Sequence, residues 1–211
     1  MSSVKLISIP CNAEYIISYC ARVSSNHQDN PNIKGLLKYC IKHSHWSIFE
    51  MANMVVEVET TRAISAQIIR HRSLFCQELS QRYKKIVEKP VIPHLRLQDH
   101  KNRQNSIDAV DPFIGNELIK KMEVLYKDID IVYNELLDKG IAKECARGIL
   151  PMNSKTRIYI NGSVRSWIHY LKVRTDPSTQ REHRTIALEI KEIFKKELPI
   201  IYSAVFPEVE E

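Results

Sequence analysis

The apolar residues between positions 116 and 139 recur at the three- and four-residue spacing of an α-helix. They are Leu118, Met122, Leu125, Ile129, Val132, Leu136 and Leu137. This pattern predicts a long amphipathic helix whose apolar stripe has to be buried against another surface. Gly140 follows the run and is expected to end the helix, because glycine readily adopts the left-handed backbone of a C-terminal cap.

Shorter patterns predict further helices and two strands. We expect helices around 16–23 with Asn12 as its cap, and at 31–43 (capped by Asn30), 141–148, 163–173 and 178–197. Another helix is expected to begin at Thr60 or Thr61 and to carry Arg70-His71-Arg72 at its end. Residues 54–60 alternate instead, with Val56 and Val58 on one face, which is typical of a strand. A brief second strand is expected at 156–160. Residues 87–115 carry three prolines and a polar run, and indicate an exposed excursion.

These elements predict the α+β class, with several helices packed on a small antiparallel sheet. A chain of 211 residues with only 5 glycines and 9 prolines favours long regular elements over flexible loops. No linker or internal repeat divides it, so we expect one domain over residues 1–211.

The charge, hydropathy and cysteine content of the chain indicate which ligands and which cellular compartment to expect. The formal net charge is +6, which suits an anionic ligand but does not require nucleic acid. No apolar run is long enough to span a membrane, and the first residues do not resemble a signal peptide. The 5 cysteines contain no CxxC pair, which favours reduced thiols over disulfides or a zinc ribbon. We therefore expect a cytoplasmic protein that binds neither membrane nor metal.

The segment from Arg70 to Tyr83 concentrates the groups that bind phosphates and polar rings. Arginines 70, 72 and 82 offer planar donors, and Ser80 adds a hydroxyl. Glu78 is suited to accept a hydrogen bond from a ribose hydroxyl. The alternative is a solvated basic turn in which Glu78 pairs with an arginine, since surface ion pairs are common.

The order of residues in this segment resembles the signature of the flavin-dependent thymidylate synthases. That signature is Arg-His-Arg, seven residues and then Ser, here Arg70-His71-Arg72 and Ser80, followed by Arg82-Tyr83. Other segments resemble the family's remaining motifs in the same order: 45–50, 146–151, 161–174, and Gln180 with Glu182. The resemblance covers about residues 10–206.

The resemblance implies a reaction. Enzymes of this family convert dUMP to dTMP with methylenetetrahydrofolate as the carbon donor, and FAD reduced by NADPH supplies the hydride. In such enzymes the cofactor carries the redox chemistry, while the protein orients and polarises the reacting groups. Members are homotetramers whose active sites lie between subunits, so the resemblance implies shared sites here.

The resemblance also assigns roles to individual residues. The residues implied for FAD are Ser47, Arg70, His71, Arg72, Glu78, Ser163, Arg165 and His169. The residues implied for dUMP are Gln67, Arg70, Glu78, Ser80, Arg82, Arg147 and Arg174. Arg174 is the implied catalytic residue: it would polarise the uracil and favour loss of its N3 proton, which activates C5.

Two other functions remain open at this point. A basic nucleic-acid-binding module would use the arginines of residues 70–82, but aromatic side chains do not alternate with them as a stacking platform requires. A homologue that binds nucleotide without catalysis is the other alternative. The presence of Arg70-His71-Arg72, Ser80, Arg147 and Arg174 argues against it.

Overall fold

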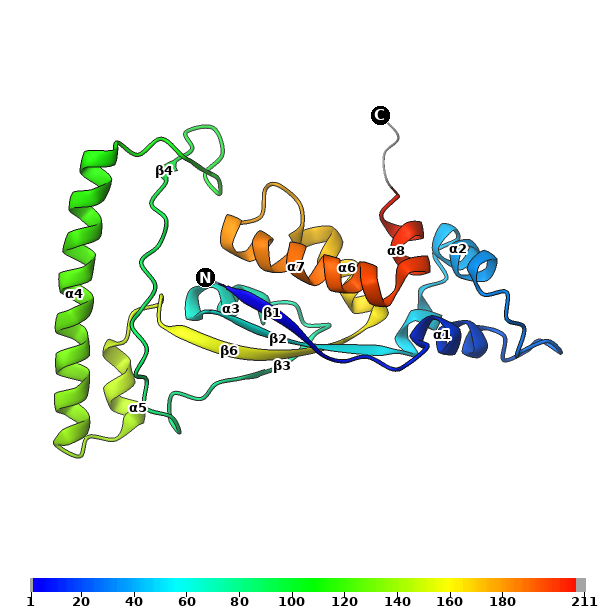
Figure 1. Cartoon of the computed structure of the whole chain (residues 1–211), viewed down its shortest axis with the longest axis horizontal. Helices are drawn as coiled ribbons and strands as arrows, with labels where there is room; N and C mark the ends of the chain where they lie inside the picture. Colours follow the sequence, from blue (N-terminus) through cyan, green and yellow to red (C-terminus); the bar gives the residue numbers. More distant parts are fainter. Residues whose placement is uncertain (1, 208–211) are drawn as a thin grey trace. The chain divides into compact units, whose positions relative to one another are not determined.

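The computed structural model describes residues 2–207 and has the predicted α+β class (Figure 1). The main sheet is small and antiparallel, with strand order β1-β2-β6-β3. Its strands are β1 (Ser3–Ser8), β2 (Asn53–Thr61), β6 (Lys155–Ser163) and β3 (Phe75–Glu78). A separate antiparallel pair joins β4 (Leu97–Gln98) to β5 (Ser106–Ile107).

The chain forms two compact units that alternate along the sequence. The first contains the residues up to 58, residues 68–77 and the residues from 159 onward, and the second contains residues 59–67 and 78–158. Strands β2, β3 and β6 and helix α3 (Arg62–Ile68) each contribute residues to both units.

Most of the helices belong to the first unit. They are α1 (Ala13–Ala21), α2 (Lys34–Lys42), the 3-10 helix η1 (Trp46–Glu50), α6 (Val164–Arg174), α7 (Arg181–Glu197) and α8 (Pro199–Val205). Helix α6 packs against α7 and η1, α2 packs against α8, and α7 also contacts β1 (Figure 1). The core is therefore built between this helical layer and the sheet.

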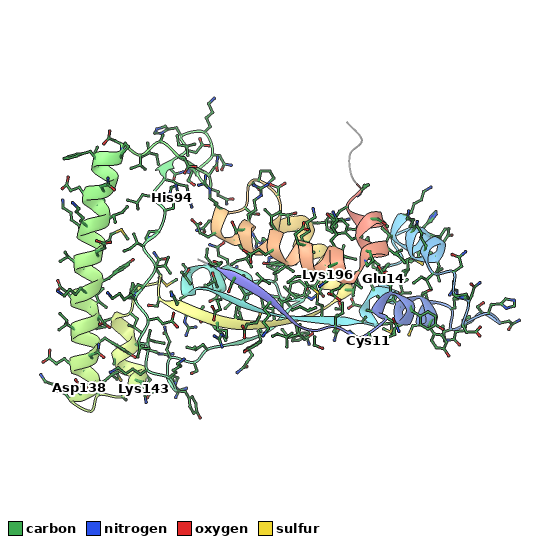
Figure 2. The ribbon with its side chains drawn as sticks, in the orientation of Figure 1. Cys11, Glu14, His94, Asp138, Lys143 and Lys196 are labelled. Carbon is green, nitrogen blue, oxygen red and sulfur yellow. The ribbon has the colours of Figure 1, made fainter. Side chains whose placement is uncertain are left out.

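Two interactions fix the helices of this unit to their neighbours. The buried Trp167 indole on α6 donates its Nε1 hydrogen to the carbonyl of Met54 on β2 at 2.9 Å. The buried Glu14 on α1 accepts a hydrogen bond from the backbone N–H of Ile201 at 2.8 Å, and Figure 2 labels its side chain. Burial raises the pKa of the Glu14 carboxyl, against the opposing effect of this hydrogen bond.

Alternation of side chains explains the two long strands. Met54, Val56 and Val58 are fully buried on one face of β2, which confirms the predicted strand. On β6 the buried positions also alternate, with Arg157 and Tyr159 exposed between them. Strand β6 is nine residues long, whereas the sequence predicted only 156–160, because the strand contains few apolar residues.

The second unit contains the long helix that the sequence predicted. Helix α4 (Pro112–Asp138) begins four residues before the expected Asn116. The Asp111 side chain caps it by accepting the N–H groups of Phe113 and Ile114 at 2.9 and 3.1 Å, and Pro112 fits the first helical position. Gly140 has φ 79 just after the helix, as its predicted capping role requires.

Short elements complete this unit. Helix α5 (Lys143–Ala146) and the 3-10 helix η2 (Arg147–Ile149) replace the single helix predicted at 141–148, and both pack on α4. Tyr133 of α4 is buried with Ile86 and Ala146, and its hydroxyl accepts the N–H of Ile86 at 3.2 Å. In the connection before α4, His94 contacts Asp108 at 3.0 Å (Figure 2).

Several predicted helix boundaries are wrong for local reasons. Helix α2 begins at Lys34 with Ile33 at its cap, because Asn30 accepts the N–H of Asn32 in a turn at 2.8 Å instead. Asn12 precedes α1 with a left-handed backbone, and its side chain does not cap the helix. Helix α7 begins at Arg181, because Asp176 holds Ser178 in a preceding turn.

Other elements were not predicted at all. These are β1, β3, β4, β5, η1 and α8. Strand β3 is four residues long, with two apolar residues followed by two polar ones, so it shows no alternation of apolar residues. Helix α3 ends at Ile68 and not at the predicted residue 72, which leaves residues 69–74 as turns before β3. Within residues 2–207, no helix combines the length and apolarity needed to cross a membrane.

Candidate active site

The turn between α3 and β3 carries His71 within the first unit. Leu74 is buried at the end of this turn and approaches Gly162 of β6 closely. A Cβ atom at position 162 would lie 2.4 Å from Cδ2 of Leu74, so any larger residue there would force the Leu74 side chain to move. The contact anchors the turn, from which Arg70 and Arg72 extend as exposed side chains while His71 is half-buried.

His71 is paired with Arg174, which lies at the last residue of α6. The Nε–H of Arg174 donates a hydrogen bond to Nε2 of His71 at 2.7 Å. Nε2 can accept it only when it carries no proton, so this geometry requires a neutral imidazole. Burial lowers the pKa of His71 to about 4, and the charges of Arg174 and His169 add to the effect.

Two buried residues lie behind His71. The ring of Tyr170, one turn before Arg174 on α6, meets the His71 ring edge-on, with centroids 4.9 Å apart. The Tyr170 hydroxyl forms a 3.0 Å hydrogen bond with Nε2 of His183 on α7. Burial raises the pKa of Tyr170, and it lowers the pKa of His183 to about 4 with help from Arg174 and His71. Arg174, His71, Tyr170 and His183 are called the arginine–histidine cluster below.

Because both histidines are held neutral, the free energy of unfolding should fall in acid. The unfolded chain takes up these protons near pH 6.5, whereas the folded protein does so only near 4. Stability is therefore expected to decrease as the pH falls from 6.5 to 4, and to depend less on these groups above 6.5. Urea denaturation at a series of pH values measures this, and His183→Gln should flatten the slope. An unchanged slope in that variant would contradict the assignment.

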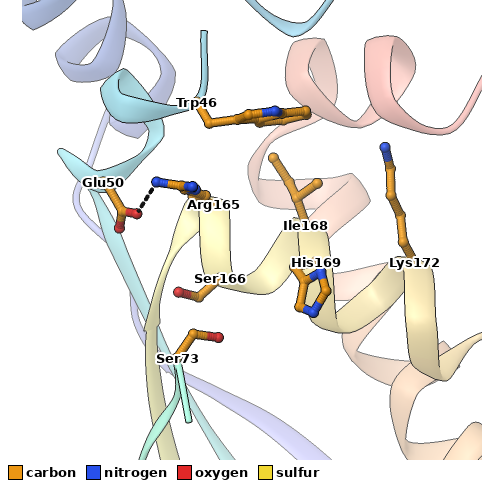
Figure 3. Close-up of a pocket in the computed structure, with 8 residues that line it drawn as sticks. All are labelled: Trp46, Glu50, Ser73, Arg165, Ser166, Ile168, His169 and Lys172. Carbon is orange, nitrogen blue, oxygen red and sulfur yellow. Dashed lines mark hydrogen bonds and ion pairs between the residues drawn. The ribbon is translucent and has the colours of Figure 1, made fainter. Parts of the chain in front are cut away.

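The first unit also contains a cavity of about 520 Å³ (Figure 3). Its lining residues are Trp46, Glu50, Ser73, Arg165, Ser166, Ile168, His169 and Lys172. Arg165 donates to a carboxylate oxygen of Glu50 at 3.2 Å, and the Lys172 ammonium lies 5.6 Å from the Trp46 ring centroid. The cavity thus combines an aromatic face, two hydroxyls, two cations and one carboxylate, which suits a ligand with both a ring and anionic groups.

The predicted flavin residues divide between this cavity and other places. Arg165 and His169 line it, and His71 lies near His169 with ring centroids 6.5 Å apart. Ser47 is exposed on η1. Ser163 caps α6, where its hydroxyl accepts the N–H of Ser166 at 3.2 Å, so in this structure it performs a structural task.

Glu78 has protein partners on all sides within the second unit. Its carboxylate accepts hydrogen bonds from Ser65 at 2.6 Å and Thr156 at 2.9 Å, and it forms an ion pair with Arg62 at 2.5 Å. Arg62 also donates to the carbonyl of Leu79 at 3.1 Å. These contacts fix the chain at the end of β3. The ion pair with Arg62 is of the kind predicted from the sequence as the alternative to a ligand-binding role, in which Glu78 pairs with an arginine.

The remaining predicted nucleotide residues also lie in the second unit. The Ser80 hydroxyl accepts the N–H of Arg82 at 3.3 Å, and the exposed Arg82 side chain pairs with Glu144 at 2.9 Å. Arg147 is half-buried at the start of η2, and Gln67 is half-buried on α3. Among residues 2–207 no group of histidine, cysteine and acidic side chains is arranged to hold a metal ion.

Sequence reasoning missed some members of the site. Tyr170 and His183 were not singled out, although the four-residue spacing of Tyr170 and Arg174 places them on one helix face. Lys172 and Ser73 of the cavity were also missed. No local pattern identifies these two residues, because their place depends on how distant segments pack.

Comparison with known proteins identifies the family. Residues 5–200 match the family model described as thymidylate synthase complementing protein. A probable flavin-dependent thymidylate synthase of Paramecium bursaria Chlorella virus 1 is 50% identical, covering 96% of this chain and 98% of its own length. A flavin-dependent thymidylate synthase of Synechocystis is 51% identical, covering 92% of this chain and 90% of that protein.

The fold is also that of a solved structure. The crystal structure of a UMP/dUMP methylase, PolB from Streptomyces cacaoi, bound with 5-Br dUMP, superimposes with a TM-score of 0.85. It covers 97% of this chain and 94% of its own, at 23% identity. This likeness supports the fold.

The chain belongs to the thymidylate synthase complementing protein family, the flavin-dependent thymidylate synthases. The resemblance inferred from the sequence is thereby confirmed at the level of the family, and the protein is an enzyme of this class. Membership favours the enzyme over the nucleic-acid-binding module that the charge of residues 70–82 had left open.

Proposed function

We propose how the residues of this chain divide the work of the family's reaction. The enzyme converts dUMP to dTMP, with methylenetetrahydrofolate as the carbon donor and FAD as its cofactor. When bound, FAD supplies the hydride that it receives from NADPH. The protein therefore has to hold a flavin, a nucleotide and a folate, and to polarise the uracil ring.

The cavity of the first unit fits the chemical groups of FAD. Arg165 and Lys172 offer positive charge to a pyrophosphate, Glu50 offers an acceptor to hydroxyl groups, and Trp46 offers a face to a ring. We assign Arg165 and His169 to this site from their place in the cavity. Ser47, Arg70, His71, Arg72, Glu78 and Ser163 remain proposals that rest on the family resemblance.

The nucleotide roles centre on Arg174. Its Nε–H already donates a hydrogen bond to His71. Within residues 2–207, its two terminal nitrogens donate no hydrogen bond. A fixed guanidinium with its fork open can donate to a uracil oxygen and stabilise the negative charge left when N3 loses its proton. Arg70, Ser80, Arg82, Arg147, Gln67 and Glu78 are proposed to hold the rest of dUMP.

The main support for this proposal is the hydrogen bond between Arg174 and His71. The first test of the proposed function is an absorption experiment. The purified protein should show flavin bands, or acquire them when FAD is added. Anaerobic NADPH should bleach these bands, and dUMP should alter the rate. With methylenetetrahydrofolate present, chromatography should detect dTMP. A protein that neither takes up FAD nor forms dTMP would overturn the proposed function.

Arg82→Ala is expected to weaken dUMP binding by about 10-fold, because the variant loses one charge-assisted hydrogen bond to dUMP. FAD binding should change little. Separate titrations of the two ligands measure this. Glu144→Ala is the matched control: it removes the partner of Arg82 but keeps the guanidinium. It should leave dUMP binding unchanged or tighten it. An unchanged dUMP constant in Arg82→Ala would contradict the assignment.

We further propose a cytoplasmic homotetramer in which the whole chain acts as one functional domain. Helix α4 supports self-association, because among the described residues only Gly115 and Tyr133 are buried on it. Phe113, Leu125 and Ile131 are more than half exposed there. Apolar side chains that gather on one helix usually mark an interface. Light scattering after gel filtration tests this, and a monomer active at nanomolar concentration would contradict it.

A further inference from the structure

We propose that Tyr170 and His183 are positioning residues that hold His71 as a neutral acceptor for Arg174 and thereby aim the Arg174 fork at the substrate. This inference rests on the proposed function, since it adds two residues to the machinery of the same site. Neither residue is among those that the family resemblance had implied.

The direction of the Arg174 guanidinium depends on its hydrogen bond to His71. Arg174 ends α6, and a side chain with four rotatable bonds at a helix end has many conformations. The 2.7 Å bond from its Nε–H to His71 fixes the plane of the guanidinium. Because the guanidinium is planar and rigid, fixing the Nε–H direction also fixes the directions of the N–H groups on both terminal nitrogens. The direction of the fork therefore depends on the place of the His71 ring.

The His71 ring is in turn oriented by its contact with Tyr170. His71 lies in a turn, which by itself does not fix a side chain. The edge-on contact with Tyr170, at 74° between the ring planes, gives the imidazole one orientation. A protonated His71 would lose the lone pair that accepts from Arg174 and would place two cations side by side. The contact with Tyr170 also keeps water from one side of the ring, which favours the neutral form.

Tyr170 is itself held in place by Trp167 and His183. Its ring packs edge-on against the buried Trp167, with centroids 5.6 Å apart, and its hydroxyl bonds His183 at 3.0 Å. Tyr170 and His183 are both fully buried. In the His183 tautomer that carries no proton on Nε2, this atom accepts the phenol hydrogen, and the pair links α7 to the ring that orients His71. A purely structural pair would need no contact with a residue that binds Arg174.

The charged and titratable groups around the pair are few. His71 faces Arg174 and His169, which both act on its charge, and His183 faces Arg174 and His71. Tyr170 faces Arg174 and Cys76. Of these, only the histidines titrate between pH 4 and 7 in the unperturbed state, so an acid limb of activity would report on them.

Tyr170→Phe is the decisive variant, because it keeps the ring but removes the hydroxyl. We expect kcat for dTMP formation to fall about 2- to 10-fold, which is the effect of one hydrogen bond. The acid limb of the kcat profile should move to higher pH, since a looser ring admits water to His71. FAD binding, measured by absorbance, should stay unchanged. The matched control is Tyr133→Phe, which removes another buried tyrosine hydroxyl that accepts a hydrogen bond in the second unit.

Variants of His183 separate positioning from packing. His183→Gln retains an oxygen that can accept from Tyr170 and should therefore retain more of kcat than His183→Leu. His183→Leu removes the acceptor and should behave like Tyr170→Phe, and the double variant should be no worse than either single one. If His183→Leu does not fold, the comparison of Tyr170→Phe with His183→Gln still decides.

Two outcomes would overturn the inference while leaving the proposed function intact. In the first, Tyr170→Phe and Tyr133→Phe both lower the melting temperature, and neither changes kcat or its pH profile. In the second, Tyr170→Phe and His183→Gln lose kcat equally, which would show that hydrogen bonding is not the property that matters. If instead the parent enzyme binds FAD but forms no dTMP, the proposed function itself is wrong.

Discussion

Arg174→Ala should lower kcat for dTMP formation by about 10²- to 10³-fold, which is the usual cost of removing a donor that stabilises developing charge. FAD should remain bound, because Arg174 does not line the cavity of the first unit. Rapid-quench measurement of a single turnover separates the chemical step from product release. Normal methylation in that single turnover would contradict the catalytic role.

Two further variants sharpen this prediction. Arg174→Lys keeps a positive charge but loses the fork and the Nε–H that His71 accepts, so it should recover only a small part of kcat. Arg103→Ala removes an exposed arginine in the second unit and should behave as the parent enzyme. Equal activity of Arg174→Lys and the parent would mean that charge alone is needed, without the bidentate geometry.

Glu78→Ala should lower the free energy of unfolding by about 3–5 kcal/mol, because it leaves Arg62 largely buried without its carboxylate. Two hydroxyls, those of Ser65 and Thr156, lose their acceptor as well. Urea denaturation measures the loss. Glu78→Gln should cost less, since its amide oxygen still accepts from the hydroxyls.

The control for this prediction is an exposed ion pair. Glu144→Ala removes the partner of Arg82 at the surface and should change stability by less than about 1 kcal/mol. A Glu78→Ala protein that is as stable as the parent would contradict the structural role of this carboxylate. Poor binding of FAD or dUMP by that stable protein would support the ligand role that the family resemblance implies.

Much of the fold could be predicted from the sequence where one face of an element is apolar. The alternation of Val56 and Val58 on β2 is such a case, because burial on one side imposes a period on the sequence. The apolar stripe along α4 also predicted a helix, although much of that stripe is exposed in this chain. Boundaries were less predictable, since they depend on individual side chains such as Asp111 and Asp176. Strands β1 and β3 lack a clear apolar pattern and depend on their neighbours in the sheet.

The candidate site was predictable only in part. Motif order gave Arg174 and His71 separately, but their contact joins residues 103 positions apart and follows from the packing of α6 beside the turn. His183 had no local signal, because its role depends on α7 lying against α6. Glu78 is a polar residue inside a motif that has internal partners in the structure, and its ligand role stays a prediction.

The alternation of the two compact units along the chain has a consequence for gene recombination. Residues 68–77 belong to the first unit but are encoded between the two segments of the second. A crossover pair that exchanges codons 59–158 between related genes therefore always transfers His71 and leaves Arg174 behind. The 2.7 Å bond between them is then formed by residues from two parents. Chimeras should be active only when both parents share the same geometry there, so the units are inherited as a whole rather than as interchangeable modules.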